Sequence, residues 1–560
     1  MNLRTTLALI GGGALLVYAL FFASSYDQRI LTLSGIYVIL VLGYQFIFGH
    51  AGALSLAQGA FFGIGAYTTG ILGSQYGTGF LITFPLSIAV AAALAALVSL
   101  PVLRLKTHYF ALATLALSQL LLLIAVNWEA VTGGANGLPG VPPITIFGAT
   151  LTRGLPLLLF VWAIVGIAIL LAHWQLRGGR IAAFTIMRET PLAAPAFGID
   201  PGLLRLRAFL LSAAFGGAAG ALFVHTNRVV SPETLGFGVM ITCLTMTVVG
   251  GRFGLLGAVI GALLLTHLPE WFRGLDEYYL VAVGVLLLAA VVFAPNGIVA
   301  LVLPDHPQPK RSPVRATRLT ATPALVQNTG VDARGLEKSY GGVRALDGVD
   351  LSFGPGDIVG VIGPNGAGKT TLANALTGLT PLDRGRVTFN GRDITSAPPH
   401  AIARAGLTRT FQTPQLPDAL TVRQVIETAQ IANGQAPDAD DALNRLGLNA
   451  EAETACGTLP HGLRRRVEMC RAIAIHPAVL VLDEPAAGLS PEEQAGIGDI
   501  CKTLAASGMG ILLIDHNIDF LAPRATRLIC MEAGRIIADG PPTQTLSNPA
   551  VRRAYFGVIA

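Results

Sequence analysis

Residues 363–370 read Gly-Pro-Asn-Gly-Ala-Gly-Lys-Thr and fit the pattern G-x-x-x-x-G-K-[ST] of a phosphate-binding loop at every position. The glycines let backbone N–H groups approach a phosphate, Lys369 adds a positive charge, and the Thr370 hydroxyl suits Mg²⁺. The apolar run 358–362 predicts a buried strand before the loop, and residues 371–376 predict a helix that begins at the phosphates. The stretch therefore predicts an α/β domain that binds ATP and Mg²⁺. The nucleotide ligands expected here are Gly363, Asn365, Gly366, Gly368, Lys369, Thr370 and Thr371.

The composition divides the chain into two halves with different solvent preferences. The length of 560 residues indicates two or more domains, and mean hydropathy is +0.61 with 13% charged residues. Only 22 of the 71 Asp, Glu, Lys and Arg residues lie in the first 305 positions. We therefore expect a multi-span α-helical membrane domain over 1–303, a cytoplasmic linker over 304–330 and an α/β P-loop ATPase domain over 331–560.

The net charge of +5 does not indicate a nucleic-acid partner. The basic residues gather in loops between apolar stretches, where they set membrane topology. The five cysteines show no spacing typical of a metal site, and four of them lie in the half expected in the cytoplasm. Reduced thiols and contact with membrane lipid are therefore expected.

Apolar stretches in the first half approach the roughly 20 residues that a spanning helix needs. Glycine and proline interrupt the chain around 49–60 and 226–240, which predicts broken or re-entrant helices there. The first stretch is interpreted as an uncleaved helix, because many more follow. The sequence predicts about ten spans, near 7–24, 30–48, 58–74, 82–103, 109–127, 154–174, 207–225, 236–250, 254–269 and 278–295.

Loop charges predict the orientation of these spans. The opposite loops carry more acidic residues, so the positive-inside rule places both termini in the cytoplasm, where ATP is found. The cations assigned to the cytoplasmic side are Arg4, Arg104, Lys106, Arg177, Arg180, Arg188, Arg205, Arg207, Arg252, Lys310 and Arg311.

The loop at about 175–206 contains an Ala-rich amphipathic segment, 188–199. It is either a solvated connector or a short coupling helix that docks onto an ATPase domain. Small residues four apart predict close helix packing, and polar residues in apolar surroundings are candidates for function. No solute-binding residue is assigned. The small and polar residues in question are Gly59, Gly63, Gly216, Gly220, His50, Gln58, His225 and Asn227.

A second chemical signal follows the phosphate loop. The apolar run 479–482 ends in Asp483 and Glu484, and adjacent carboxylates at the end of a buried strand are rarely structural. Such a strand delivers Asp483 to Mg²⁺ and Glu484 to the attacking water as a general base. This pair completes the pattern of an ATP-hydrolysing site.

Three further residues are weaker candidates when taken one at a time. Gln412 is a candidate sensor of the γ-phosphate and Mg²⁺, with an ordinary loop residue as the alternative. His516, after the apolar run 511–514, is a candidate for polarising the γ-phosphate or positioning water, and otherwise closes a strand. Tyr340 is a candidate for stacking on adenine, and otherwise a core or surface aromatic.

The order phosphate loop, Gln412, Asp483-Glu484 and His516 resembles an ABC-type ATPase domain over nearly all of 331–557. The resemblance implies a dimer of ATPase domains that holds ATP between one phosphate loop and the partner's signature peptide. The matching segment, 459–468, keeps only Leu459 and Gly462 of the usual Leu-Ser-Gly-Gly-Gln. Gly462 is then expected at the partner's nucleotide, and unequal sites are expected. The departures include Pro460 and Leu463 in this segment and Ser490, which stands where the D-loop usually has Asp.

Longer runs resemble the branched-chain amino acid importer family. GPNGAGKTTLANALTG, RTFQ, LDEPAAGLSP and DHNIDFL are similar to its first ATPase subunit. GHAGALSLAQGAFFGIGAYT, LRLKTHYFALATLALSQ, VTGGANGLPGVP and SPETLGFGVMI are similar to its second permease subunit. The chain is identified as a fusion of the two.

This resemblance implies one half of an importer in a bacterial inner membrane, with its ATPase domain in the cytoplasm. The expected partners are a second permease subunit, a second ATPase subunit and a periplasmic or lipid-tethered solute-binding protein. Branched-chain amino acids are the expected solute, with urea or short amides as the alternative. An ABC exporter fits the short loops less well, and a membrane-tethered regulatory ATPase is the alternative of a different class.

Overall fold

The computed structural model describes residues 13, 17–105, 107–272, 278, 281, 284–285, 288–289, 292–302 and 330–556. The chain forms two compact units, 1–177 with 202–307, and 178–201 with 308–560. The second unit thus includes a short piece of the first half of the sequence. The predicted boundaries around the linker at 304–330 lie almost entirely outside the described residues and stay predictions.

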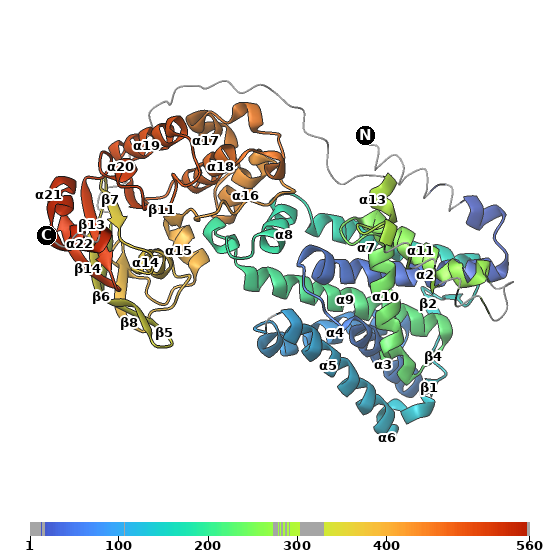
Figure 1. Cartoon of the computed structure of the whole chain (residues 1–560). Helices are drawn as coiled ribbons and strands as arrows, with labels where there is room; N and C mark the ends of the chain where they lie inside the picture. Colours follow the sequence, from blue (N-terminus) through green and yellow to red (C-terminus); the bar gives the residue numbers. More distant parts are fainter. Residues whose placement is uncertain are drawn as a thin grey trace. The chain divides into compact units, whose positions relative to one another are not determined.

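The first unit consists mainly of helices, with one small β-hairpin and one short pair of strands that are distant in the sequence (Figure 1). β1 (Leu138–Pro139) pairs with β4 (Val229–Val230), and β2 (Ile144–Ile146) pairs with β3 (Ala149–Leu151). The main helices are α2 (Ser25–Tyr44), α3 (Gln58–Tyr76), α4 (Phe80–Val102), α5 (Thr107–Asn127), α7 (Leu155–Gln175), α9 (Pro201–Asn227), α10 (Phe237–Gly250) and α11 (Leu255–Trp271).

The predicted number of about ten spans is not confirmed. Within the described residues, five helices are long and apolar enough to cross a membrane, or six if α10 and α11 together make one. α10 and α11 meet at a bend of 120°, so two predicted spans form one broken element. The first and last predicted spans lie largely outside the described residues. The five helices that are each long and apolar enough are Ser25–His50, Phe80–Val102, His108–Asn127, Leu155–Gln175 and Pro201–Asn227.

The helix breaks expected around 49–60 and 226–240 are present. α2 continues as a π-helical turn, Gln45–His50, and regular structure resumes only at Gln58. After α9 the chain passes through β4 and a 3₁₀ turn, Pro232–Leu235, before α10 begins.

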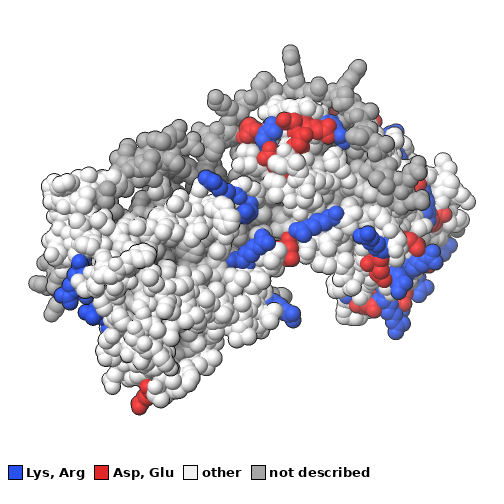
Figure 2. Space-filling model, turned by 180° about the vertical axis from the view of Figure 1, so that it is seen from behind, with Lys and Arg blue, Asp and Glu red and all other residues white. Residues whose placement is uncertain are grey.

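The apolar surface of the first unit is visible in Figure 2 as wide areas without charged side chains, whereas Lys, Arg, Asp and Glu crowd the ATPase unit.

Glycines bring α3 into close contact with both α9 and the 3₁₀ turn before α10. A Cβ on Gly220 would lie 1.9 Å from the carbonyl oxygen of Phe62, and one on Gly65 would lie 2.2 Å from that of Gly217. A Cβ on Gly63 would lie 2.2 Å from the Leu235 side chain. Only hydrogen fits at these positions, so packing is the role of these glycines.

Two of the polar candidates connect helices instead of facing an open path. Gln58 is buried, and its amide donates to the carbonyls of Leu40 (3.1 Å) and Ser212 (3.2 Å). His225 contacts Thr83 Oγ1 (2.7 Å) and the carbonyl of Pro142 (2.8 Å). Both side chains therefore hold the bundle together, which the sequence left undecided.

The second unit contains two sheets. A six-stranded sheet has the order β10-β11-β12-β7-β13-β14 and is parallel except at β14, and a four-stranded antiparallel sheet has the order β6-β5-β8-β9. The strands of the first are β7 (Ile358–Ile362), β10 (Leu407–Arg409), β11 (Val479–Asp483), β12 (Gly510–Ile514), β13 (Arg527–Glu532) and β14 (Arg535–Gly540). Those of the second are β5 (Val331–Tyr340), β6 (Val343–Phe353), β8 (Arg384–Phe389) and β9 (Arg392–Asp393).

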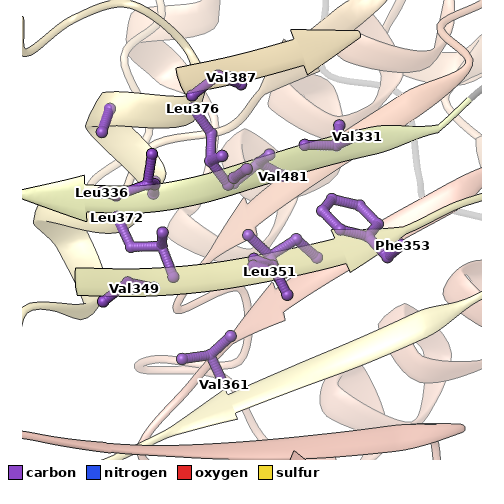
Figure 3. Packing of buried hydrophobic residues seen from close by; sticks show 14 of the residues in the cluster. Val331, Leu336, Val349, Leu351, Phe353, Val361, Leu372, Leu376, Val387 and Val481 are labelled. Carbon is purple, nitrogen blue, oxygen red and sulfur yellow. The ribbon is translucent and has the colours of Figure 1, made fainter. Parts of the chain in front are cut away.

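Helices flank these sheets, and one core joins the elements around the phosphate loop. Leu372 and Leu376 of α14 (Lys369–Leu376) lie between the sheets with Leu351, Val361 and Val481 in one buried cluster (Figure 3). The predicted strand and helix on either side of the loop are confirmed. The remaining helices used below are α15 (Pro399–Ala405), α16 (Val422–Ala432), α18 (His461–Ile473), α19 (Pro491–Ala506) and α22 (Pro549–Phe556).

Candidate nucleotide site

Four neighbouring parallel strands place the predicted site at one edge of the sheet. Asp483 pairs with Ile514 across β11 and β12, and Ile514 pairs with Val361 across β12 and β7. The carboxyl ends of these strands therefore meet, and parallel α/β sheets bind ligands at that edge. β10 runs beside β11, so the loop carrying Gln412 begins at the same edge.

The phosphate loop has the backbone that its glycines were expected to supply. Gly363, Gly366 and Gly368 have φ of 152°, 82° and 101°. A Cβ on Gly363 or Gly368 would lie 2.2 Å from the carbonyl of Met531 or Ala345, respectively. Lys369 is buried, and its amino group donates to the carbonyls of Gly363 (2.6 Å) and Pro364 (3.0 Å). Burial lowers the Lys369 pKa below its usual value.

Asp483 is 2% exposed and forms a buried ion pair with Arg409 across 3.2 Å. Burial raises the pKa of the Asp483 carboxyl, and the Arg409 charge opposes that rise. The same guanidinium donates to Asn374 Oδ1 (2.6 Å) at α14 and lies over the Phe411 ring at 4.8 Å. A cation thus balances the carboxylate that we expect to contact Mg²⁺.

Glu484 lies beside two other predicted residues. Gln412 Nε2 donates to Glu484 Oε2 at 2.8 Å, and His516 Nδ1 lies 3.8 Å from the same oxygen. Glu484 has a φ of 46°, a conformation that non-glycine residues rarely adopt and that clusters at functional sites. Tyr555 of α22 donates to the His516 carbonyl at 3.0 Å. The structure thus brings Gln412, Glu484 and His516 together, with the His516 side chain 63% exposed.

Helix α18 presents buried charges to this edge. Arg465 is fully buried and donates to the carbonyls of Phe411, Gln412 (2.5 Å) and Glu484 (3.0 Å). Glu468 pairs with Arg465 at 3.2 Å and accepts from the Phe411 N–H at 3.0 Å. Desolvation raises the pKa of the Glu468 carboxyl. Together the pair fixes the backbone of the Gln412 loop to the peptide that carries Glu484.

The altered signature and D-loop residues have local roles in the fold. Pro460 is the N-cap residue of α18, and a Cβ on Gly462 would lie 2.1 Å from Glu493 Oε1. Ser490 begins α19 in a capping box, with its Oγ accepting from the Glu493 N–H at 3.3 Å. Ser490 therefore serves as a helix cap, a role that the usual Asp would fill equally well. Gly462 contacting a partner's ATP stays a prediction.

Tyr340 lies at the end of β5 with its side chain half exposed. Its hydroxyl donates to Thr380 Oγ1 at 3.3 Å, and Lys338 Nζ lies 5.5 Å from the ring centroid. The exposed ring has room for a stacking partner. Contact with adenine stays a prediction.

The amphipathic segment of the first half folds as part of the ATPase unit. α8 (Gly179–Glu189) packs on α16, and the Glu189 carboxylate accepts from the Ala419 N–H at 3.2 Å. A 3₁₀ turn, Ala194–Phe197, follows. Three side chains of the ATPase fold donate to its backbone, namely Arg471 to Ala196 O (2.9 Å), Asn433 to Phe197 O (2.9 Å) and Arg404 to Gly198 O (2.8 Å). The segment is therefore docked and not a solvated connector.

Arg471 connects this docked segment to the nucleotide edge. Its buried guanidinium lies 4.7 Å from the Phe197 ring centroid and also donates to the Arg409 carbonyl at 2.9 Å. The sequence analysis missed Arg409, Arg465, Glu468 and Arg471. A partial signal was present, because the charged residues at positions 465, 468 and 471 share one face of a helix, but the adjacent Arg464 and Arg466 concealed it.

Models of two protein families match the chain. Residues 28–291 match the permease component of the branched-chain amino acid transport system, and residues 346–487 match the ABC transporter family. The Escherichia coli (strain K12) permease protein LivM, of a high-affinity branched-chain amino acid transport system, is 32% identical over 318 residues, which are 52% of this chain and 75% of LivM. The chain belongs to the ABC transporter family. Its first half belongs to the branched-chain amino acid permease family.

The ATPase half of this ABC transporter has relatives of two kinds. BraF of Pseudomonas aeruginosa, a high-affinity branched-chain amino acid transport ATP-binding protein, is 34% identical and covers 40% of this chain and 97% of BraF. LptB of E. coli, a lipopolysaccharide export ATP-binding protein, is also 34% identical over 40% of the chain and 96% of its own length. The solved ADP conformation of MJ1267, an ATP-binding cassette, is 33% identical with a TM-score of 0.39, covering 41% of this chain and 99% of the other.

The residues at the sheet edge fit a nucleotide. Gly366 is exposed with no atom within 4 Å of an added Cβ, so the loop leaves open space beside its backbone. Lys369, at the start of the helix after β7, interacts electrostatically with Asp483 and Glu484 at the end of β11. As an ABC transporter the chain binds ATP, and its hydrolysis is coupled to transport.

Proposed function

We propose that this chain is one half of an importer that carries branched-chain amino acids into a bacterial cell at the expense of ATP. The permease match over 28–291 supports this proposal most directly, because it covers the part of the chain that the solute must cross. The ATPase half is equally similar to BraF and LptB. It therefore supports ATP-driven transport but does not indicate the solute or its direction.

In the proposed hydrolysis, the phosphate loop holds ATP through Gly363, Asn365, Gly366, Gly368, Lys369, Thr370 and Thr371. Asp483, Thr370 and Gln412 would hold Mg²⁺, which would neutralise phosphate charge. Glu484 accepts a proton from the attacking water, and His516 orients the γ-phosphate. Support comes from Gln412, Glu484 and His516 meeting within 4 Å at the carboxyl end of the sheet.

Buried charged residues connect the nucleotide site to the docked segment, and this connection can couple hydrolysis to transport. Arg409 balances Asp483, while its carbonyl accepts from Arg471, which also binds Ala196 of the docked segment. A shift at the γ-phosphate that moves the loop carrying Gln412 must therefore alter contacts of residues 194–198. Because this segment continues directly into α9, the movement is transmitted to a helix of the permease half.

The proposed assembly follows from the family and from the altered signature. A second permease, a second ATPase and a solute-binding protein complete the transporter in the inner membrane, with the ATPase domain in the cytoplasm. Leu463 stands where the ABC signature usually has Gln, so a heteromer with unequal ATP sites is favoured over a homodimer.

Solute-stimulated ATPase activity tests this proposal. The chain is purified with the subunits that assemble with it, reconstituted in proteoliposomes and mixed with its binding protein. Leucine, valine and isoleucine are expected to raise the hydrolysis rate, and urea and acetamide are not. Stimulation by urea alone would mean that urea, and not a branched-chain amino acid, is the solute. Hydrolysis that responds to no solute would favour a regulatory ATPase.

A further inference from the structure

The permease unit contains a cavity of about 400 Å³ whose lining carries two guanidinium groups. It lies where the loop after the π-helical turn meets the connection between α4 and α5 and the first turns of α9. Its volume falls in the usual range of small-ligand sites, about 300–1,000 Å³. The lining residues are Ala51, Gly52, Ala53, Leu103, Arg104, Leu105, Phe110 and Arg205.

Arg104 and Arg205 have guanidinium N–H donors without a protein acceptor in the described part of the chain. Arg205 is part-buried, and its Nε is inaccessible to solvent without a hydrogen-bond partner in the described part of the chain. Neither Arg104 nor Arg205 forms an ion pair or hydrogen bond there. Leaving a buried donor unpaired costs free energy, because the donor loses its hydrogen bonds to water. An anion in the cavity would satisfy the buried donor of Arg205 and pair with the exposed Arg104, and a phosphate accepts from arginine in a bidentate manner.

The surroundings of the cavity distinguish a lipid phosphate from a free one. Leu97 and Leu100, on the last turns of α4, are 71% and 68% exposed, and Tyr109 and Leu112, on the first turns of α5, are 64% and 61% exposed. Apolar surface of this kind suits acyl chains. An exposed tyrosine next to it is typical of the membrane–water interface. Loop charges place the Arg104 end on the cytoplasmic side, where basic pockets between helices bind anionic headgroups.

We propose that this cavity binds the phosphate of an anionic phospholipid, with Arg104 and Arg205 as its ligands and the exposed leucines of α4 and α5 along its acyl chains. The lipid thereby holds the α4–α5 connection against the start of α9. Because α9 continues from the docked segment, the bound headgroup lies next to the connection between ATPase and permease.

The test measures lipid retention by native mass spectrometry. The full chain, with its associated subunits, is purified in detergent, stripped of lipid and mixed with phosphatidylglycerol, phosphatidylcholine or inorganic phosphate. Wild-type protein is expected to retain phosphatidylglycerol at least tenfold better than phosphatidylcholine. R104Q/R205Q is expected to lose this preference, and R104K/R205K to keep most of it. R207Q is the matched control, because Arg207 is exposed and lies two residues further along the same helix.

Three outcomes decide the proposal. Equal retention of phosphatidylglycerol by R104Q/R205Q and R207Q would overturn the site. Full displacement of the lipid by millimolar inorganic phosphate, with no preference between the two lipids, would show that the cavity binds free phosphate and not a lipid headgroup. An unchanged thermal midpoint of R104Q/R205Q without lipid, together with lost retention, would support a ligand role over a folding defect.

Discussion

Glu484 combines a backbone conformation that most residues avoid with a carboxylate that two side chains approach. Its φ is 46°, and its own carbonyl and its side chain are both engaged, by Arg465 (3.0 Å) and Gln412 (2.8 Å). Glutamate in the left-handed region costs about 1–3 kcal/mol, which surrounding contacts must offset. The residue is therefore held in place more firmly than its part-exposed position suggests.

At this residue we predict that Glu484→Gln abolishes hydrolysis and preserves ATP binding. The amide keeps the shape and cannot accept a proton, so the rate is expected to fall by about 10²–10⁴-fold, the usual contribution of a general base. Phosphate release and binding of a fluorescent ATP analogue are the measurements. Glu492→Gln, exposed in the first turn of α19, is the control. A rate within twofold of wild type would remove Glu484 from the mechanism.

Arg409 is predicted to matter for stability as well as for metal binding. Arg409→Met leaves Asp483 as an unpaired buried carboxylate, and breaking a buried pair costs about 3–5 kcal/mol. Thermal unfolding is expected at a lower temperature in Arg409→Met. R409M/D483N should recover part of the loss, because both charges are removed. Added Mg²⁺ should raise the midpoint of Arg409→Met more than that of the double variant. Equal midpoints for all three proteins would contradict this account.

At the scale of elements, α18 and the docked segment 178–201 decide how the ATPase edge is connected. α18 reaches the Gln412 loop through Arg465 and Glu468, and the docked segment through Arg471. The 3₁₀ turn of this segment is held by side chains that donate to backbone carbonyls, while α8 packs on α16. Hydrogen bonds to backbone carbonyls depend on the backbone conformation of the segment and not on its side chains. A movement of the segment therefore changes these hydrogen bonds directly.

We predict that N433A/R404A uncouples hydrolysis from solute. Each substitution removes one hydrogen bond to the segment, worth about 1 kcal/mol, while the nucleotide edge is untouched. Basal ATPase activity should stay within twofold of wild type, and the solute-stimulated increment should fall about tenfold. Arg423→Ala, on the surface of α16, is the control. An undiminished increment would mean that these contacts do not transmit the signal.

The contact between α3 and α9 gives a prediction for the permease half. Gly220→Val places a side chain where the Phe62 carbonyl lies 1.9 Å from an added Cβ. The helices must separate, and overpacking of this kind costs about 1–3 kcal/mol. Thermal unfolding of the purified protein in detergent should shift down. Gly238→Ala, with no atom within 4 Å of its added Cβ, should not shift it. Equal midpoints would show that α3 and α9 tolerate separation.

At the scale of the whole molecule, the sequence predicted what local patterns determine. The phosphate loop, the strand ending in Asp483 and the order of the elements around them follow from runs of neighbouring residues. The buried arginines escaped prediction because their partners are carbonyls far along the chain. Arg471 and Ala196 are 275 positions apart. The predicted number of spans is not confirmed within the described residues, and hydropathy alone did not show that α10 and α11 meet at 120°.

The central claim is that one polypeptide supplies both part of the solute path and an ATPase domain that drives transport. ATP-driven uptake of radiolabelled leucine into proteoliposomes tests that claim most directly, with the assembled transporter oriented so that ATP reaches the ATPase domain and binding protein and leucine are supplied on the opposite face. The wild-type chain is expected to accumulate leucine only with ATP, and Glu484→Gln to reduce uptake to the level without ATP. Uptake that persists unchanged in Glu484→Gln would contradict it, because the work would then be done by a partner's ATPase alone.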